Sequence, residues 1–271
     1  MKELGQKIEN YIIKGTYYFF KKVRKSRIYI LRKGAGNMKL VSSKRELVVL
    51  ICLVILLIIS NIIITRGVLM TDNIPGTDVF NIYRARIIDT LLHLVFLVFG
   101  VLLYKHSHQN NYFSNGFEEI TLKNITSFII SLLIILFTNI QWFFVNEAQL
   151  EMLTSSSKYN LLFKNYYNIL GYSLRAGVGE EIIFRLFLIS LFVFIIKKIN
   201  VKIDAVKVSV VIASLLFIFI HPLGNFLFAF LVFMVGLGFG YLFVNNGLLW
   251  CIVVHFAADI IGFTVGYFKV M

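Results

Sequence analysis

Two adjacent acids and an arginine, Glu180, Glu181 and Arg185, head a run of residues that is otherwise apolar through Ile196. Ionisable groups inside a membrane segment cost at least about 2.5 kcal/mol each, so they mark functional sites by default. On an α-helix Glu181 and Arg185 share a face, whereas Glu180 is rotated by about 100°. The spacing predicts a Glu181–Arg185 ion pair and leaves Glu180 available for chemistry. The alternative is a structural salt bridge with a spare acid.

Two later apolar runs carry further titratable groups. His221 ends one run, with Phe217 one turn before it on the same face. His255 and Asp259 lie one turn apart in the middle of the last run. His221 is equally compatible with an interfacial residue. For the His255–Asp259 pair, the alternative is a hydrogen bond between packed helices. At a rise of about 1.5 Å per residue, all these groups fall in the middle-to-outer part of a bilayer, where three helices can enclose one polar cavity.

These residue types suit the hydrolysis of a peptide bond by an activated water. A glutamate in an apolar pocket is a competent general base, and a histidine can share the proton or donate to the oxyanion. Cys251, one turn before His255, is the only nucleophile close to these groups on its own helix. We expect no cofactor. A zinc ion held by Glu180, His221 and His255 is the second mechanism, because two histidines and a glutamate form a known catalytic zinc set.

The composition determines which elements must position these residues. The chain has 271 residues, of which 58% are hydrophobic and 15% charged, and its mean hydropathy is +0.81. Soluble domains carry about 25% charged residues. We therefore predict an all-α fold, a polytopic transmembrane helical bundle with about seven spans. The predicted spans are Leu47–Ile64, Ile87–Tyr104, Ile125–Val145, Glu180–Ile196, Val206–His221, Phe226–Val244 and Leu248–Phe268.

Two further segments are predicted to lie at the membrane surface. Residues 1–45 hold 13 of the 27 Lys and Arg residues, interleaved with aromatic side chains, which predicts a basic amphipathic helix on an anionic membrane. This distribution favours the membrane over nucleic acid as the partner. Tyr159–Arg175 is apolar but interrupted by polar residues, so we expect an interfacial or half-inserted helix that leads into the Glu-Glu segment.

The distribution of positive charge predicts the orientation in the membrane. With the amino terminus inside, the inner segments hold 19 Lys and Arg residues and the outer segments hold 7. Cytoplasmic loops carry the excess of positive charge, so we predict a cytoplasmic amino terminus. A full crossing by Tyr159–Arg175 would invert everything that follows it.

The order of the motifs resembles the CAAX protease and bacteriocin-processing (CPBP, or Abi) family of intramembrane glutamic endopeptidases. Glu180-Glu181-x-x-x-Arg185, Phe217-x-x-x-His221 and His255-x-x-x-Asp259 follow one another on consecutive apolar segments. The resemblance covers about residues 160–270. It implies that Glu180 is the catalytic acid and that His221 helps it to hold and activate a water. It further implies that Glu181 and Arg185 support the site, while His255 and residue 259 stabilise the oxyanion. The well-studied relatives have Asn where this chain has Asp259.

Three functions follow as hypotheses. The first is an intramembrane endopeptidase of the cell membrane that cleaves a lipidated, CAAX-type or membrane-associated peptide or protein. Its partners would be the lipid bilayer and that substrate, and its domains a surface segment (1–45), amino-terminal spans (46–150) and a catalytic core (151–271). The second is a non-catalytic regulatory or immunity protein of the same family. The third is a proton-coupled transporter, which the absence of an internal repeat disfavours.

Overall fold

The described part of the chain is a bundle of helices. The computed structural model describes residues 44–70, 76–109, 125–144, 161–199, 203–221 and 226–270, and none of these residues lies in a β-strand. The predicted all-α fold is confirmed for this part of the chain. The basic surface segment predicted for residues 1–45 lies almost wholly outside it, and the proposed division at residue 150 stays a prediction. The helices are α2 (Lys44–Leu69), α3 (Gly76–Gln109), α4 (Ile125–Phe144), α7 (Tyr166–Arg175), α8 (Ser190–Ile199), α9 (Ala205–Ile218), α10 (Phe226–Asn246) and α11 (Leu248–Val270), with π-helical segments η1 (Ala176–Glu180) and η2 (Ile182–Ile189) between α7 and α8.

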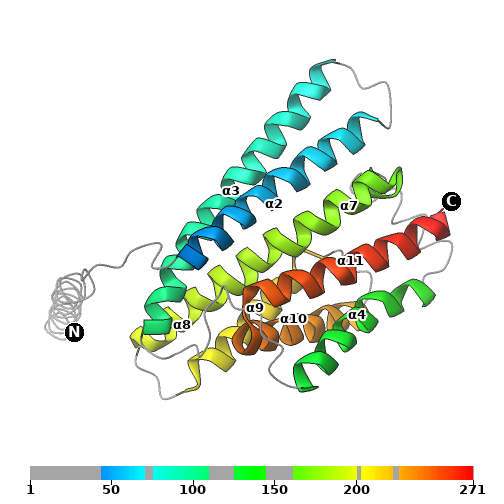
Figure 1. Cartoon of the computed structure of the whole chain (residues 1–271). Coiled ribbons are helices and arrows are strands. Elements are labelled where there is room, and N and C mark those ends of the chain that lie inside the picture. Colours follow the sequence, from blue (N-terminus) through cyan, green and yellow to red (C-terminus); the bar gives the residue numbers. More distant parts are fainter. Residues whose placement is uncertain are drawn as a thin grey trace, which may run out of the picture. The chain divides into compact units, whose positions relative to one another are not determined.

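One unbroken helix, running from Tyr166 to Ile199 through α7, η1, η2 and α8, carries the paired acids, and we call it the site helix. It begins with a side-chain cap, because Asn165 Oδ1 accepts a hydrogen bond from the Asn168 N–H at 2.9 Å. In Figure 1 it lies between α2 and α11, and it also packs against α3 and α9. The helix that carries Glu180 and Glu181 is therefore surrounded by other helices.

The site helix joins two segments that the sequence suggested were separate. The predicted span Glu180–Ile196 forms its second half, and the carboxyl-terminal part of the predicted surface helix Tyr159–Arg175 forms its first turns. Because the helix is continuous, these two segments make one passage through the bundle.

An apolar core surrounds the site helix. Val178, Ile182 and Leu186 are fully buried and belong to one cluster with Val101 of α3 and Phe239 of α10. Burying a large aliphatic side chain contributes about 1.5–3 kcal/mol relative to leaving it in water. The packing of this core fixes where the polar residues of the site helix point.

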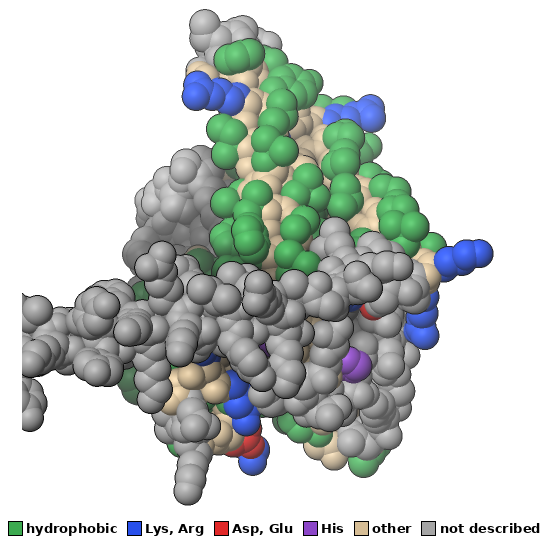
Figure 2. Space-filling model, turned by 90° about the vertical axis from the view of Figure 1, so that its left-hand side faces the viewer, with side chains coloured by type: hydrophobic (Ala, Val, Ile, Leu, Met, Phe, Trp, Pro, Cys, Tyr) green, Lys and Arg blue, Asp and Glu red, His purple; other side chains and the backbone are tan. Residues whose placement is uncertain are grey.

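Several helices present apolar side chains outward. Figure 2 shows hydrophobic side chains over the outer faces of α2 and α3 in its upper part. Four helices of the described part are long and apolar enough to cross a membrane: Lys44–Leu69, Val79–His108, Phe226–Asn246 and Leu248–Lys269. Ile125–Ile140 and Ala205–Ile218 are apolar but shorter. The fold thus agrees with a helical membrane bundle, and the number of seven spans stays a prediction.

Candidate active site

Glu181, Arg185 and His255 form a buried group of charged and polar side chains. The Glu181 and Arg185 side chains are fully buried, and Arg185 Nε lies 3.3 Å from Glu181 Oε2. His255 Nδ1 of α11 donates a hydrogen bond of 2.8 Å to Glu181 Oε1. The ion pair predicted from the i,i+4 spacing is present in the structure. It links the site helix to α11 through the histidine.

Three aromatic rings complete the surroundings of Arg185. Its Cζ lies 4.7 Å from the ring centre of Phe217, 5.4 Å from that of Phe239 and 5.9 Å from that of Phe184. None of its three guanidinium nitrogens makes a hydrogen bond of good geometry to the described residues. The cation is therefore compensated by one carboxylate and by ring faces, which attract a desolvated cation. A buried ion whose compensation is this limited depends strongly on its single partner.

Glu180 is in a different environment from its neighbour. Its side chain is 17% exposed, and Oε2 is buried without a hydrogen-bond partner among the described residues. The closest basic atom is His255 Nε2, 3.9 Å from Oε2. One acid of the pair is thus engaged in the ion pair and the other is available, as the spacing predicted.

His255 lies between three carboxylates. Its Nε2 is 3.6 Å from Asp259 Oδ2, beyond hydrogen-bond distance, while Nδ1 bonds Glu181. The family resemblance implies that His255 and residue 259 together stabilise the oxyanion. In the structure Glu181 supplies the hydrogen bond that orients the ring, and the Phe239 ring stacks on it at 4.8 Å. The ring therefore presents Nε2 to the side where Glu180 and Asp259 lie.

His221 joins this group through Phe217. It lies in the turn that follows α9, three residues after the helix ends at Ile218, so the predicted span to His221 is slightly too long. Its Nδ1 donates to the Phe217 carbonyl at 2.9 Å, and the two rings are 4.5 Å apart. The Phe217 ring also lies 6.3 Å from the His255 ring. Since Nδ1 donates, Nε2 is the basic nitrogen of a neutral His221 ring.

Two glycines allow neighbouring helices to approach the site helix closely. A Cβ at Gly177 would lie 3.0 Å from the Phe256 backbone nitrogen of α11, and a Cβ at Gly179 would lie 2.4 Å from His93 Nε2 of α3. Both glycines belong to the π-helical segment η1. Such segments are rare and occur frequently at functional sites. The sequence gives no periodicity signal for a π-helix, so this feature was not predicted.

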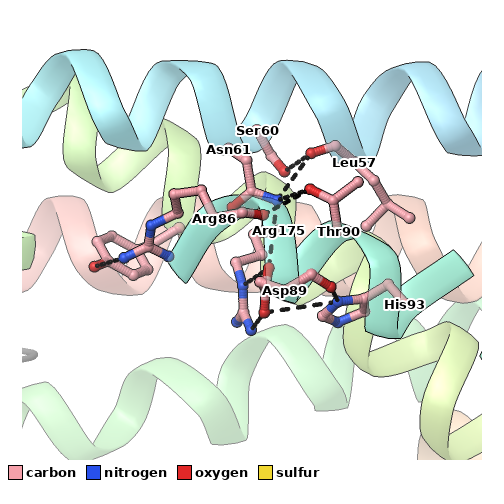
Figure 3. Close-up of polar contacts among 9 residues, drawn as sticks. Leu57, Ser60, Asn61, Arg86, Asp89, Thr90, His93 and Arg175 are labelled. Atoms are coloured by element: carbon pink, nitrogen blue, oxygen red, sulfur yellow. Dashed lines mark hydrogen bonds and ion pairs between the residues drawn. The ribbon is translucent and has the colours of Figure 1, made fainter. Parts of the chain in front are cut away.

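A second polar cluster lies beside Gly179, between α2, α3 and α7 (Figure 3). Asp89 of α3 accepts two hydrogen bonds from Arg175, at 2.9 Å from Nε and at 2.5 Å from Nη2. Asn61 of α2 donates to the same carboxylate at 3.3 Å. His93 Nδ1 donates to the Asp89 carbonyl at 2.7 Å, so the ring is fixed where it contacts Gly179. Asp89 and His93 lie four residues apart in a predicted span, and the rule that selected Glu180 would also have selected them.

The described residues contain no group of three or more His, Cys, Asp or Glu side chains arranged to hold a metal ion. Cys251 is buried, and its thiol points to the Phe239 carbonyl oxygen at 3.5 Å. The cysteine thus has a packing partner on α10.

A known family model matches the carboxyl-terminal part of the chain. Residues 162–261 match the family model described as Type II CAAX prenyl endopeptidase Rce1-like. The match covers less than half of the chain and includes Glu180, His221, His255 and Asp259. The resemblance to the CAAX protease family is therefore confirmed for this region. No curated protein and no solved structure matches the chain.

Proposed function

From the match of residues 162–261 to the Type II CAAX prenyl endopeptidase Rce1-like family model, we propose that the chain is a multi-pass endopeptidase of the cell membrane. Its substrate would be a lipidated or membrane-associated peptide or protein. The observation that carries the proposal is the asymmetry of the two acids. Glu181 accepts a hydrogen bond of 2.8 Å from His255 and lies 3.3 Å from Arg185 Nε, whereas Glu180 Oε2 lies 3.9 Å from His255 Nε2.

In the proposed reaction Glu180 is the general base. Its carboxylate takes a proton from a water, whose oxygen attacks the scissile carbonyl carbon. The resulting tetrahedral intermediate collapses, the C–N bond breaks, and the proton passes from Glu180 to the leaving amine. His221 would help to hold the water, for which Nε2 of a neutral ring is a suitable acceptor. A general base of this kind typically contributes about 10²–10⁴-fold to the rate.

His255 would stabilise the oxyanion. Glu181 fixes the ring through Nδ1, so Nε2 is directed toward Glu180 and Asp259. In its protonated form His255 carries an N–H on both ring nitrogens, so Nε2 can donate to the oxyanion while Nδ1 stays bonded to Glu181. A donor held in place before the reaction stabilises the developing charge without reorganisation. Asp259 Oδ2, 3.6 Å from His255 Nε2, lies close enough to complete this environment when protonated, by donating directly to the oxyanion.

The proposed reaction uses no metal. One experiment tests both the proteolytic activity and the role of Glu180 in it. Cells that express the wild-type chain or Glu180→Gln are compared by sequencing the new peptide termini in their membrane fraction. We expect termini that depend on the wild-type chain to be absent in the variant, although the variant is inserted and folded. Undiminished processing by Glu180→Gln would contradict the glutamic mechanism. Loss of wild-type cleavage on chelation, restored by zinc, would favour the zinc mechanism.

A further inference from the structure

A groove of about 570 Å³ lies between α2 and α3, away from the acids of the candidate active site. Apolar side chains line it from both helices, among them Ile58 and Ile62 of α2 and Ile87 and Leu91 of α3. Its volume lies within the range of about 300–1,000 Å³ that is usual for ligand sites. The Ile62 and Ile87 side chains are 60% and 59% exposed, so the groove opens outward from the bundle.

Two arginines line the same groove without an acid beside them. These are Arg66, in the last turn of α2, and Arg86 of α3. No acidic side chain of the described residues lines the groove. Asp89 is the acid closest to Arg86 along α3, and it already accepts two hydrogen bonds from Arg175. The described residues therefore supply no carboxylate to balance the two cations.

Arg86 is only partly satisfied by the protein. Its Nη2 makes a long contact of 3.4 Å with the Tyr172 hydroxyl, and its Nε is buried without a hydrogen-bond partner among the described residues (Figure 3). A guanidinium group has five N–H donors in a planar fork that matches phosphate geometry. A cation in this position at the edge of an apolar groove favours a ligand that carries both an anionic group and an apolar chain.

We propose that this groove binds one anionic phospholipid of the surrounding bilayer. The phosphate lies between Arg66 and Arg86, and an acyl chain lies along Ile58, Ile62 and Leu91. Apolar outward faces on α2 and α3 place the groove against lipid (Figure 2). Basic pockets between membrane helices are a recurrent way of holding acidic head groups.

The floor of the groove connects it to the candidate active site. Asn61 and Thr90 line the groove, and the Asn61 amide donates both to Thr90 Oγ1 at 3.0 Å and to Asp89 at 3.3 Å. Asp89 in turn holds Arg175 of the site helix. A lipid in the groove thus lies against Asn61, whose hydrogen bond to Asp89 connects it to the network that contacts Gly179. Its binding stabilises the packing of α2 and α3 on the site helix.

Native mass spectrometry of the full chain in detergent tests the proposal, because it counts bound lipids without requiring proteolysis. The probes are dioleoylphosphatidylglycerol and dioleoylphosphatidylcholine, which share their acyl chains and differ in head-group charge. We expect one tightly bound phosphatidylglycerol and clearly weaker binding of phosphatidylcholine. Arg86→Gln and Arg66→Gln should each weaken phosphatidylglycerol binding by about fivefold, the equivalent of about 1 kcal/mol per cation.

Two further variants make the test specific. Arg84→Gln removes an exposed cation of α3 that does not line the groove, so it should leave binding unchanged. Ile62→Trp fills the groove from an exposed position and should weaken both lipids. If Arg86→Gln fails to fold because of its Tyr172 contact, Arg66→Gln still tests the head-group site. Equal binding of the two lipids, or an equal loss with Arg84→Gln, would overturn the proposal.

Discussion

Glu180 and Glu181 are neighbours in sequence but differ in what depends on their charge. Removing the Glu181 charge leaves Arg185 buried with only ring faces around it, and breaking a buried pair in this way costs about 3–5 kcal/mol. The contact of Glu180 Oε2 with a basic atom, His255 Nε2, is longer, at 3.9 Å. We therefore expect Glu181→Gln to lower the melting temperature in detergent clearly more than Glu180→Gln does. The opposite order of stability would exchange the roles of the two acids.

Asp259 is the position where this chain differs from the Asn of the well-studied relatives. It lies 3.6 Å from His255 Nε2, where an amide could act in place of a carboxylic acid. We expect Asp259→Asn to retain substantial proteolytic activity, and Asp259→Ala and His255→Ala to lose most of it, by about 10²-fold or more. The measurement is the rate of product formation by purified variants. An inactive Asn variant would show that the negative charge itself is required, and a fully active Ala variant would assign residue 259 to packing.

Contacts between residues four positions apart could be predicted at this scale, and contacts between helices could not. The Glu181–Arg185 pair and the Phe217–His221 contact follow from a spacing of four residues. The hydrogen bond from His255 to Glu181 joins residues 74 positions apart, and that from Arg175 to Asp89 joins residues 86 apart. A single sequence carries no signal for such distant pairs, so the orienting partner of His255 was open until the structure was known.

Among the elements, the site helix departs most from what the sequence predicts. Apolar runs located the helices, because their length and hydropathy are sequence properties. The predicted span had regular α-helical geometry from Glu180 onward, whereas η1 and η2 are π-helical on both sides of Glu181. In η1, α11 packs against Gly177 and α3 packs against Gly179. That packing exists only in the folded bundle, so the sequence alone does not show it.

Gly179 tests the contact between α3 and the site helix. In Gly179→Ala the added methyl group would meet His93 Nε2 at 2.4 Å, and the ring is held by its bond to the Asp89 carbonyl. We expect a lower melting temperature and a loss of activity of about 10²-fold, because a displacement of about 1 Å at the acids has an effect of that size. Both are measured on the purified variant.

Two further variants control this experiment. In Gly238→Ala the nearest atoms are the ends of the flexible Ile134 side chain at 3.0 and 3.1 Å, so the effect should be small. Adding His93→Ala to Gly179→Ala should recover part of the lost melting temperature, because the clashing ring is gone. A Gly179→Ala variant with wild-type stability and activity would show that this close contact does not position the acids.

At the scale of the whole molecule, the contacts between helices fix their relative directions. The Glu46–Lys105 ion pair and the Asn61–Thr90 bond make α2 and α3 antiparallel. α4 is antiparallel to α10, because Ser127 donates to Asn246 and Ile134 lies beside Gly238. It is parallel to α11, because Trp250 donates to Ser131 and Asn139 donates to the Ala258 carbonyl. Gly100 beside Leu186 and Phe187, with Gly179 beside His93, makes α3 parallel to the site helix. The consecutive helices α2 and α3, and likewise α10 and α11, thus run in opposite directions, as a chain that crosses one membrane repeatedly must do.

These directions sharpen the prediction of topology. Tyr166–Ile199 is one continuous helix, so a separate crossing by Tyr159–Arg175, which would have inverted the rest of the chain, does not fit the structure. Arg175, counted among the outer charges, is paired with Asp89, and Lys105, counted among the inner ones, is paired with Glu46, so the excess of positive charge on the inner side is unchanged. The continuous helix and this excess both favour a cytoplasmic amino terminus.

Single cysteines introduced in intact cells test this orientation, on a background that lacks Cys52 and Cys251. With the amino terminus inside, α2 ends and α3 begins outside, whereas the site helix ends inside. A cysteine at position 71 should therefore react with a membrane-impermeant reagent, and one at position 200 should react only after the cells are opened. Labelling at position 200 in intact cells would reverse the orientation. Because Glu180 lies near the middle of the site helix, 14 residues after Tyr166 and 19 before Ile199, such a result would reverse the direction of the helix but change the depth of the acids little.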